Sequence, residues 1–214
     1  MLLKLLLTQT EKTMKRLILF LVVLALISFK TADTTLSAEE RKVAIDQLTQ
    51  SKEHFLKSIK GLSADQLNFK ASPTSWSVAE CAEHIAISEG VIWGMVDGAL
   101  KQPADPTKRS EVKMSDAQIV GMITDRTNKI KTQEMFEPSN KFGSHDAAVK
   151  EFVAKRDGHV EYVKTTQDDL RNRYSTLPFG TIDSYQVILF LAGHSERHTK
   201  QIEEVMANVN FPKK

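Results

Sequence analysis

Apolar residues recur three or four positions apart over most of this chain, which is the spacing of one face of an α-helix. No stretch alternates apolar and polar residues as a half-buried strand does. Two capping boxes, Ser37-Ala38-Glu39-Glu40 and Ser77-Val78-Ala79-Glu80, mark helix starts, because their Ser and Glu side chains accept backbone N–H groups that the first turn leaves free. The sequence predicts helices that begin after Ser37, Ser77, Ser115 and Ser144, and a last helix over residues 182–208.

The order of these helices predicts an antiparallel four-helix bundle. Four of them are long, and one extended connection over residues 101–144 joins the second to the third. Pro103 and Pro106 break the pattern where this connection starts, and an extra short helical segment follows at about residues 115–131. The 9 Gly, 6 Pro and single Cys81 among 214 residues exclude collagen-like, low-complexity and disulfide-framework proteins. We therefore expect an all-α fold in one domain.

The N-terminal residues have the layout of a secretory signal peptide. Residues 17–27 are all apolar and follow Lys15 and Arg16 directly, whereas a membrane-spanning helix needs about 20 apolar residues. Met14 is a natural start for such a peptide. We expect residues 1–32 to be removed and residues 33–214 to form the domain, exported to the periplasm or secreted. The alternatives are an uncleaved N-terminal membrane anchor or a buried first helix.

The small positive charge of the chain does not indicate a nucleic-acid partner. The chain has 29 basic and 27 acidic residues, a net charge of +2. Residues 1–32 hold five basic residues and one acidic residue, so the expected domain keeps 24 basic and 26 acidic residues, a net charge of −2. No basic run interleaved with aromatic residues occurs. We expect a small-molecule substrate or ligand as the partner, with no nucleic acid and no stable membrane span after cleavage.

The last predicted helix contains the motif HSERH, which places His194 and His198 four residues apart on one face. Both lie at the centre of an apolar stripe that includes Leu191 and Ile202, so both are expected to point into the bundle. Each imidazole carries a donor and an acceptor that need partners in an apolar core. A shared metal ion would satisfy them, and so would backbone carbonyls or water. The sequence leaves both interpretations open.

Spacing excludes several other metal sites. Glu196 projects about 200° around the helix from His194, so HSERH is not the HExxH motif of a zinc protease with its Glu base. The chain has neither the Glu-x-x-His spacing of di-iron bundles nor the C-x-x-C-H of c-type haem. A mononuclear site with three protein ligands remains. For the third ligand, helical position favours His84 and His159 over His54 and His145, and does not choose between the first two.

Two segments resemble the DinB-like superfamily of metal-binding four-helix bundles. They are WSVAECAEHI at residues 76–85 and FLAGHSERHTKQIEEV at residues 190–205, and the approach GLSADQLNFKASPTSW before the first strengthens the resemblance. The resemblance implies that His84, His194 and His198 bind a divalent transition metal, zinc or nickel. The connection over residues 101–144 is longer than the simplest members need, so it could cover one mouth of the site.

Three other polar residues are candidates for a role near the metal. Arg156 lies at the centre of the apolar stripe of the third long helix, and an inward guanidinium needs a negative partner. We interpret Arg156 as holding a substrate carboxylate; the alternatives are an internal ion pair with Glu80 or another acid, or a side chain that reaches past the core edge. Gln201 and Glu80 could orient the histidines by hydrogen bonds, although an interhelical amide bond and the capping box explain them equally well.

The resemblance also implies a metal-dependent enzyme whose metal acts as a Lewis acid on a bound thiol or water. The chemistry would be that of a transferase or a hydrolase, with a low-molecular-weight thiol as an optional cofactor. Export weakens the thiol version, because such thiols are scarce outside the cytoplasm. The alternative is an exported, non-catalytic protein that binds a metal or a small ligand in a stress-related role. Relatives often dimerise, which leaves a homodimer open, and the sequence names no catalytic residue.

Overall fold

The computed structural model describes residues 34–127 and 131–213. The signal peptide predicted for residues 1–32 lies outside the described residues, so its removal and the export of the domain stay predictions. Among the helices of the described part, none is both long and apolar enough to cross a membrane.

Four long helices form the bundle, and three of them begin next to the cap that the sequence predicted. The hydroxyls of Ser37 and Ser77 each accept the backbone N–H of the Glu three residues later, and that Glu side chain accepts the N–H of its Ser. Ser144 caps the third long helix through the N–H of Ala147. The long helices are α2 (Ala38–Ile59), α4 (Val78–Leu100), α6 (His145–Thr165) and α7 (Ser184–Met206).

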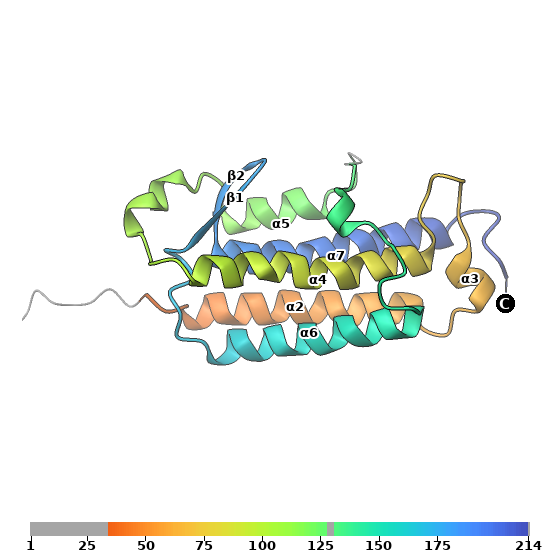
Figure 1. Ribbon diagram of the computed structural model, residues 1–214, viewed down its shortest axis with the longest axis horizontal. Helices are drawn as coiled ribbons and strands as arrows, with labels where there is room; N and C mark the ends of the chain where they lie inside the picture. Colours follow the sequence, from red (N-terminus) through yellow and green to blue (C-terminus); the bar gives the residue numbers. More distant parts are fainter. Residues whose placement is uncertain (1–33, 128–130, 214) are drawn as a thin grey trace, which may run out of the picture. The chain divides into compact units, whose positions relative to one another are not determined.

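The chain directions of these helices require a long crossover. α2 and α7 run in one direction, and α4 and α6 run in the other (Figure 1). α7 and α6 each pack against both α2 and α4. Because α4 ends at one end of the bundle and α6 begins at the other, the connection between them must travel the length of the bundle. The four-helix bundle with a long connection between its second and third long helices is therefore confirmed.

The described part of the crossover carries three short helices, of which α5 is the extra helix predicted from Ser115. They are η1 (Pro106–Glu111), α5 (Asp116–Thr124) and η2 (Glu134–Phe136). α5 packs against α7 and ends earlier than the expected residue 131. The reason is local, because the Asp125 carboxylate accepts the backbone N–H and the hydroxyl of Thr127, a turn that competes with further helix.

The sequence did not indicate the β-hairpin, the short helix α3 (Ala64–Asn68), or the short helices η1 and η2 of the crossover. Strands β1 (Tyr174–Leu177) and β2 (Gly180–Asp183) pair antiparallel in a segment for which no strand was predicted. The prediction that the chain has no strands was therefore wrong. Each strand has only four residues, which is too few to show a clear alternation of apolar and polar residues. The last helix begins at Ser184 rather than residue 182, because the Asp183 side chain caps it through the N–H of Gln186.

The bundle core consists of two apolar clusters with a polar layer between them. Leu48 and Ile92 belong to the cluster at one end, and Phe55 and Ile85 belong to the other. Each long helix contributes one buried side chain to a single hydrogen-bonded group that lies between the stretches feeding these two clusters. These four side chains are Ser51 of α2, Glu89 of α4, Arg156 of α6 and Ser195 of α7.

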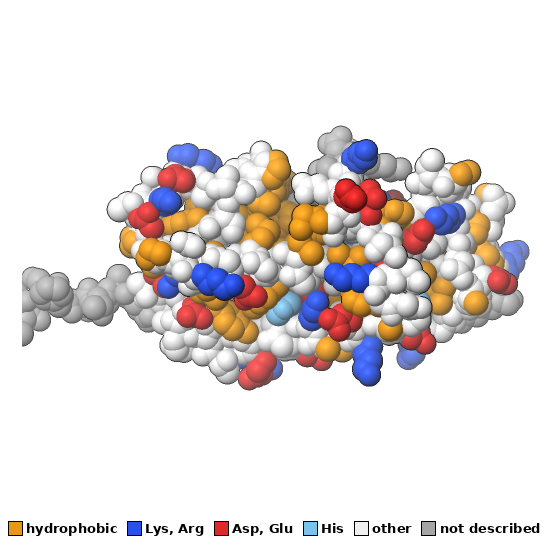
Figure 2. Space-filling view, in the orientation of Figure 1, with side chains coloured by type: hydrophobic (Ala, Val, Ile, Leu, Met, Phe, Trp, Pro, Cys, Tyr) orange, Lys and Arg blue, Asp and Glu red, His pale blue; other side chains and the backbone are white. Residues whose placement is uncertain are grey.

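Charges of both signs are distributed over the surface. On the face shown in Figure 2, Lys and Arg side chains lie among Asp and Glu side chains, and no continuous basic patch forms on it. Many of these charges form exposed pairs within one helix, such as Lys42 with Asp46 and Lys155 with Glu151. Such pairs contribute about 0–1 kcal/mol each.

A glycine sets the close approach of α5 to α7. A Cβ on Gly193 would overlap a methyl group of Ile123 in α5. We expect Gly193→Ala to lower the free energy of unfolding by about 1–3 kcal/mol through overpacking, as measured by urea denaturation. Gly98→Ala in α4 is the matched control, because a Cβ there meets no neighbour, and it should stabilise by up to about 1 kcal/mol. Equal effects of the two variants would contradict this packing.

Candidate metal centre

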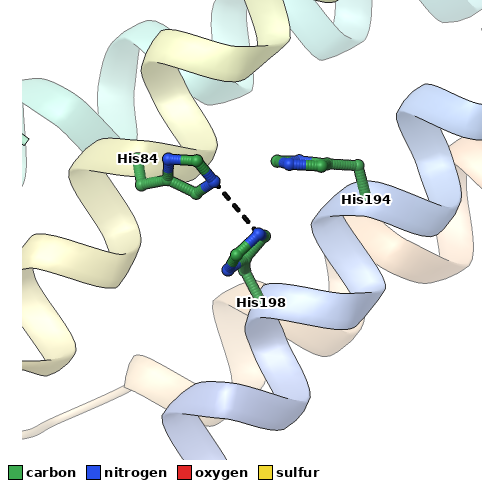
Figure 3. A group of neighbouring side chains, drawn as sticks. All are labelled: His84, His194 and His198. Atoms are coloured by element: carbon green, nitrogen blue, oxygen red, sulfur yellow. Dashed lines mark hydrogen bonds between the residues drawn. The ribbon is translucent and has the colours of Figure 1, made fainter. Parts of the chain in front are cut away.

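Three histidines from two antiparallel helices converge on one point. His84 lies on α4, and His194 and His198 lie one turn apart on α7 (Figure 3). One ring nitrogen of each lies within 4.8 Å of the others. The structure therefore brings together the three residues that the resemblance implied. His159, which helical position alone could not exclude, lies elsewhere and bonds to Glu89 through Nδ1, at 2.8 Å.

Hydrogen bonds fix which nitrogen of two rings carries the proton. Nδ1 of His84 lies 2.7 Å from the backbone carbonyl oxygen of Phe136, and Nδ1 of His198 lies 2.8 Å from Oε1 of Gln201. Arg126 donates to the same Gln201 oxygen at 3.3 Å, which identifies that atom as the amide oxygen. Both oxygens can only accept, so both rings donate from Nδ1. Each Nε2 is left with a lone pair.

The two lone pairs face each other. Nε2 of His84 and Nε2 of His198 are 3.0 Å apart, and a contact between two acceptors is repulsive unless a cation lies between them. Two imidazole nitrogens that bind one tetrahedral zinc ion lie about 3.3 Å apart, close to this separation. Nδ1 of His194 is buried and has no hydrogen-bond partner in the described part of the chain. The three-histidine cluster therefore fits a metal site.

Burial keeps these histidines in the form that binds metals. Loss of water around the ring lowers the pKa of His84 to about 4, although its hydrogen bond to Phe136 opposes the shift. Burial lowers the pKa of His194 and His198 well below the ordinary value, and the neighbouring imidazoles add to the effect. All three rings are neutral at pH 7, so a metal does not have to displace protons from them.

A pocket of about 490 Å³ opens beside the cluster. His198 and Gln201 reach its wall, and the indole of Trp76 forms another part of it. The Trp76 ring lies against His84, with ring centroids 4.8 Å apart. Two arginines, Arg126 and Arg197, also line this pocket. A small molecule in the pocket would therefore lie next to His198, one of the three clustered histidines.

The structure supports one of the two predicted orienting residues. Gln201 accepts from His198, as the sequence suggested. Glu80 does not reach His84, because its carboxylate accepts from the Ser77 cap and pairs with Lys70 at 2.7 Å. The backbone carbonyl of Phe136 takes that place. The sequence could not indicate Phe136, because a carbonyl on a crossover segment carries no side-chain pattern.

Arg156 does not reach a substrate. Its guanidinium is fully buried, and its five N–H groups find protein acceptors: both carboxylate oxygens of Glu89 at 2.6–2.7 Å, the Leu48 carbonyl, and the hydroxyls of Ser51 and Ser195. No donor is left for a substrate carboxylate, so that interpretation of Arg156 is corrected. The internal ion pair is what the structure shows, with Glu89 rather than Glu80 as the partner.

The remaining candidate side chains also lie outside the cluster. His54 and His145 are half-buried, and His54 bonds to Glu196 and Glu203 of α7. Cys81 packs in an apolar cluster, where burial raises the pKa of its thiol to about 12. It stays protonated at neutral pH and behaves as a small apolar residue.

Comparison with known proteins agrees with this architecture. The sequence model of the DinB superfamily matches residues 47–202. The protein named "Uncharacterized protein YuaE" of Bacillus subtilis (strain 168) is 25% identical over 152 residues, which cover 71% of this chain and 90% of YuaE. The structure of YfiT from Bacillus subtilis superposes with a TM-score of 0.51 at 14% identity, covering 83% of this chain and 92% of YfiT. That structure is described as a probable metal-dependent hydrolase with an unusual four-helix bundle topology.

Proposed function

This chain belongs to the DinB superfamily, and from its three-histidine cluster we propose that it is a metal-dependent hydrolase of a small molecule. Zinc and nickel are the metals we expect. The observation that carries the proposal is the 3.0 Å separation of two Nε2 atoms that both present lone pairs beside an open pocket. The description of YfiT as a probable metal-dependent hydrolase supports hydrolysis over group transfer. The export predicted for this chain also favours water over a thiol.

The residues of the cluster and those around it have different roles: some would bind the metal, some orient the imidazole rings, and one shields them from water. His84, His194 and His198 would hold the metal, which would supply a Lewis acid that lowers the pKa of a water or thiol towards neutrality. Three ligands of a four-coordinate ion leave one position for a reactant. Phe136 and Gln201 hold two of the rings in one tautomer and one orientation. Trp76 covers one side of His84 and limits the access of bulk water from there.

A screen of metal-loaded protein tests the proposal. We expect the zinc- or nickel-loaded chain to hydrolyse at least one member of a panel of chromogenic esters, amides and lactones. Removal of the metal by a chelator, or His84→Ala, should lower the rate by about a hundredfold or more, because the Lewis acid is lost. His54→Ala is the control, since His54 lies outside the cluster and bonds to the carboxylates of Glu196 and Glu203 in α7.

The alternative hypotheses, group transfer and binding without catalysis, predict different results in the same screen. Turnover that requires both a thiol and an electrophile would replace hydrolysis by group transfer. A metal-loaded protein that turns over nothing, while a compound of the panel raises its melting temperature, would contradict catalysis and favour the binding protein.

A further inference from the structure

The pocket beside the histidines is rich in positive charge. Arg126, which follows α5, and Arg197 of α7 both line it, and the only carboxylate among its described lining residues is that of Glu204. Histidine binds metals as a neutral ligand, so three histidines would leave the charge of a divalent metal uncompensated. One acid therefore faces two guanidiniums and a dication, and this balance favours an anion as the pocket's ligand.

The two arginines differ in what they can offer such an anion. Arg197 is buried and donates to the backbone carbonyls of Ile123 and Asp125, so it fastens the end of α5 to α7. Arg126 forms a bidentate pair with the carboxylate of Glu204, to which its Nε and Nη2 donate at 2.6 Å each. This is the geometry in which a guanidinium recognises a carboxylate or a phosphate.

The exposure of the pair shows which partner can leave. The side chain of Arg126 is only 14% exposed, whereas that of Glu204 is 55% exposed. A carboxylate at the surface regains water when it leaves a guanidinium, so its replacement costs little. Glu204 therefore marks the position that an incoming oxyanion can take on Arg126, next to Gln201 and His198.

We propose that this pocket binds a small oxyanion, a carboxylate or a phosphate, on Arg126, and that the substrate of the proposed hydrolase carries this group. The inference rests on the proposed function for the role of the metal, and on the pocket alone for the role of Arg126. The Trp76 indole beside the site provides an apolar surface for the rest of such a molecule.

Calorimetric titration of the zinc-loaded full chain tests the proposal, with phenylacetate, inorganic phosphate and the neutral phenylacetamide as probes. We expect phenylacetate to bind at least about tenfold more tightly than phenylacetamide, because the neutral amide cannot form the charge-assisted hydrogen bond that the carboxylate forms with Arg126. Arg126→Gln should weaken phenylacetate and phosphate about tenfold to a hundredfold. Glu204→Gln should strengthen both, because it removes the competing carboxylate. Arg41→Gln, which affects a bond to the Thr166 carbonyl between α2 and the end of α6, should change nothing.

The outcomes separate this proposal from the metal site. Zinc content is measured for every variant. A chain that holds no zinc but still binds phosphate through Arg126 would contradict the metal site at the histidines and support the oxyanion site at Arg126. Equal binding of the acid and the amide, unchanged affinity in both Arg126→Gln and Glu204→Gln, or no binding of either oxyanion at millimolar concentration would overturn the proposal.

Discussion

Arg156→Met is expected to lower the free energy of unfolding by about 3–5 kcal/mol, since it leaves the carboxylate of Glu89 buried without its cation. Both side chains of this pair are 0% exposed. Among the described residues, His159 also contacts Glu89, but its imidazole makes one bond to the carboxylate where the guanidinium makes two. Urea denaturation of the two proteins measures the difference directly.

Two further variants separate the loss of charge pairing from the loss of packing. Arg156→Met with Glu89→Leu should recover most of the stability, because an apolar pair can replace a buried ion pair at little cost. The hydroxyls of Ser51 and Ser195 keep partners in that variant, since both also donate to carbonyls of their own helices. Lys155→Met, which breaks an exposed pair with Glu151, should cost less than about 1 kcal/mol. An equally small loss for Arg156→Met would contradict the buried pair.

His194→Ala combined with His198→Ala is expected to abolish tight metal binding, because only one of three imidazole ligands remains. A metal at a hundred times its dissociation constant stabilises the folded wild type by about 2.7 kcal/mol, which raises its melting temperature. The double variant should show no such shift when zinc or nickel is added. Calorimetric melting curves with and without metal give the comparison.

A second pair of histidines serves as the control for this experiment. His54→Ala combined with His145→Ala removes the same number of imidazoles from outside the cluster. This control should keep the full metal-dependent rise in melting temperature. A rise that survives in His194→Ala/His198→Ala, or disappears equally in both double variants, would place the metal elsewhere on the chain.

The predictable parts of the fold are those that local patterns encode. Ser37 and Ser77 begin helices because their side chains act within one turn, and this information is complete in four residues. The face shared by His194 and His198 follows from helix geometry in the same way. The hairpin at residues 174–183 was missed because its short strands pair with each other and with little else, so no periodic apolar face distinguishes them.

The unpredicted parts of the site depend on contacts between segments far apart in sequence. Arg156 was identified as an inward charge, but periodicity on one helix does not say which acid faces it. A signal for Glu89 was present, because it lies four residues after Ile85 and three before Ile92 on the apolar stripe of α4. Two inward charges of opposite sign on different helices would have suggested the pair. No comparable signal exists for the Phe136 carbonyl.

The metal content of the protein tests the central claim most directly. Elemental analysis of the full chain, purified without chelators and then reloaded with zinc or nickel, should find about one divalent transition metal ion per chain, held at a site with three protein ligands. The same analysis of the His194→Ala/His198→Ala variant should find almost none. Less than about a tenth of an equivalent in the wild type after reloading would contradict a metal site at His84, His194 and His198.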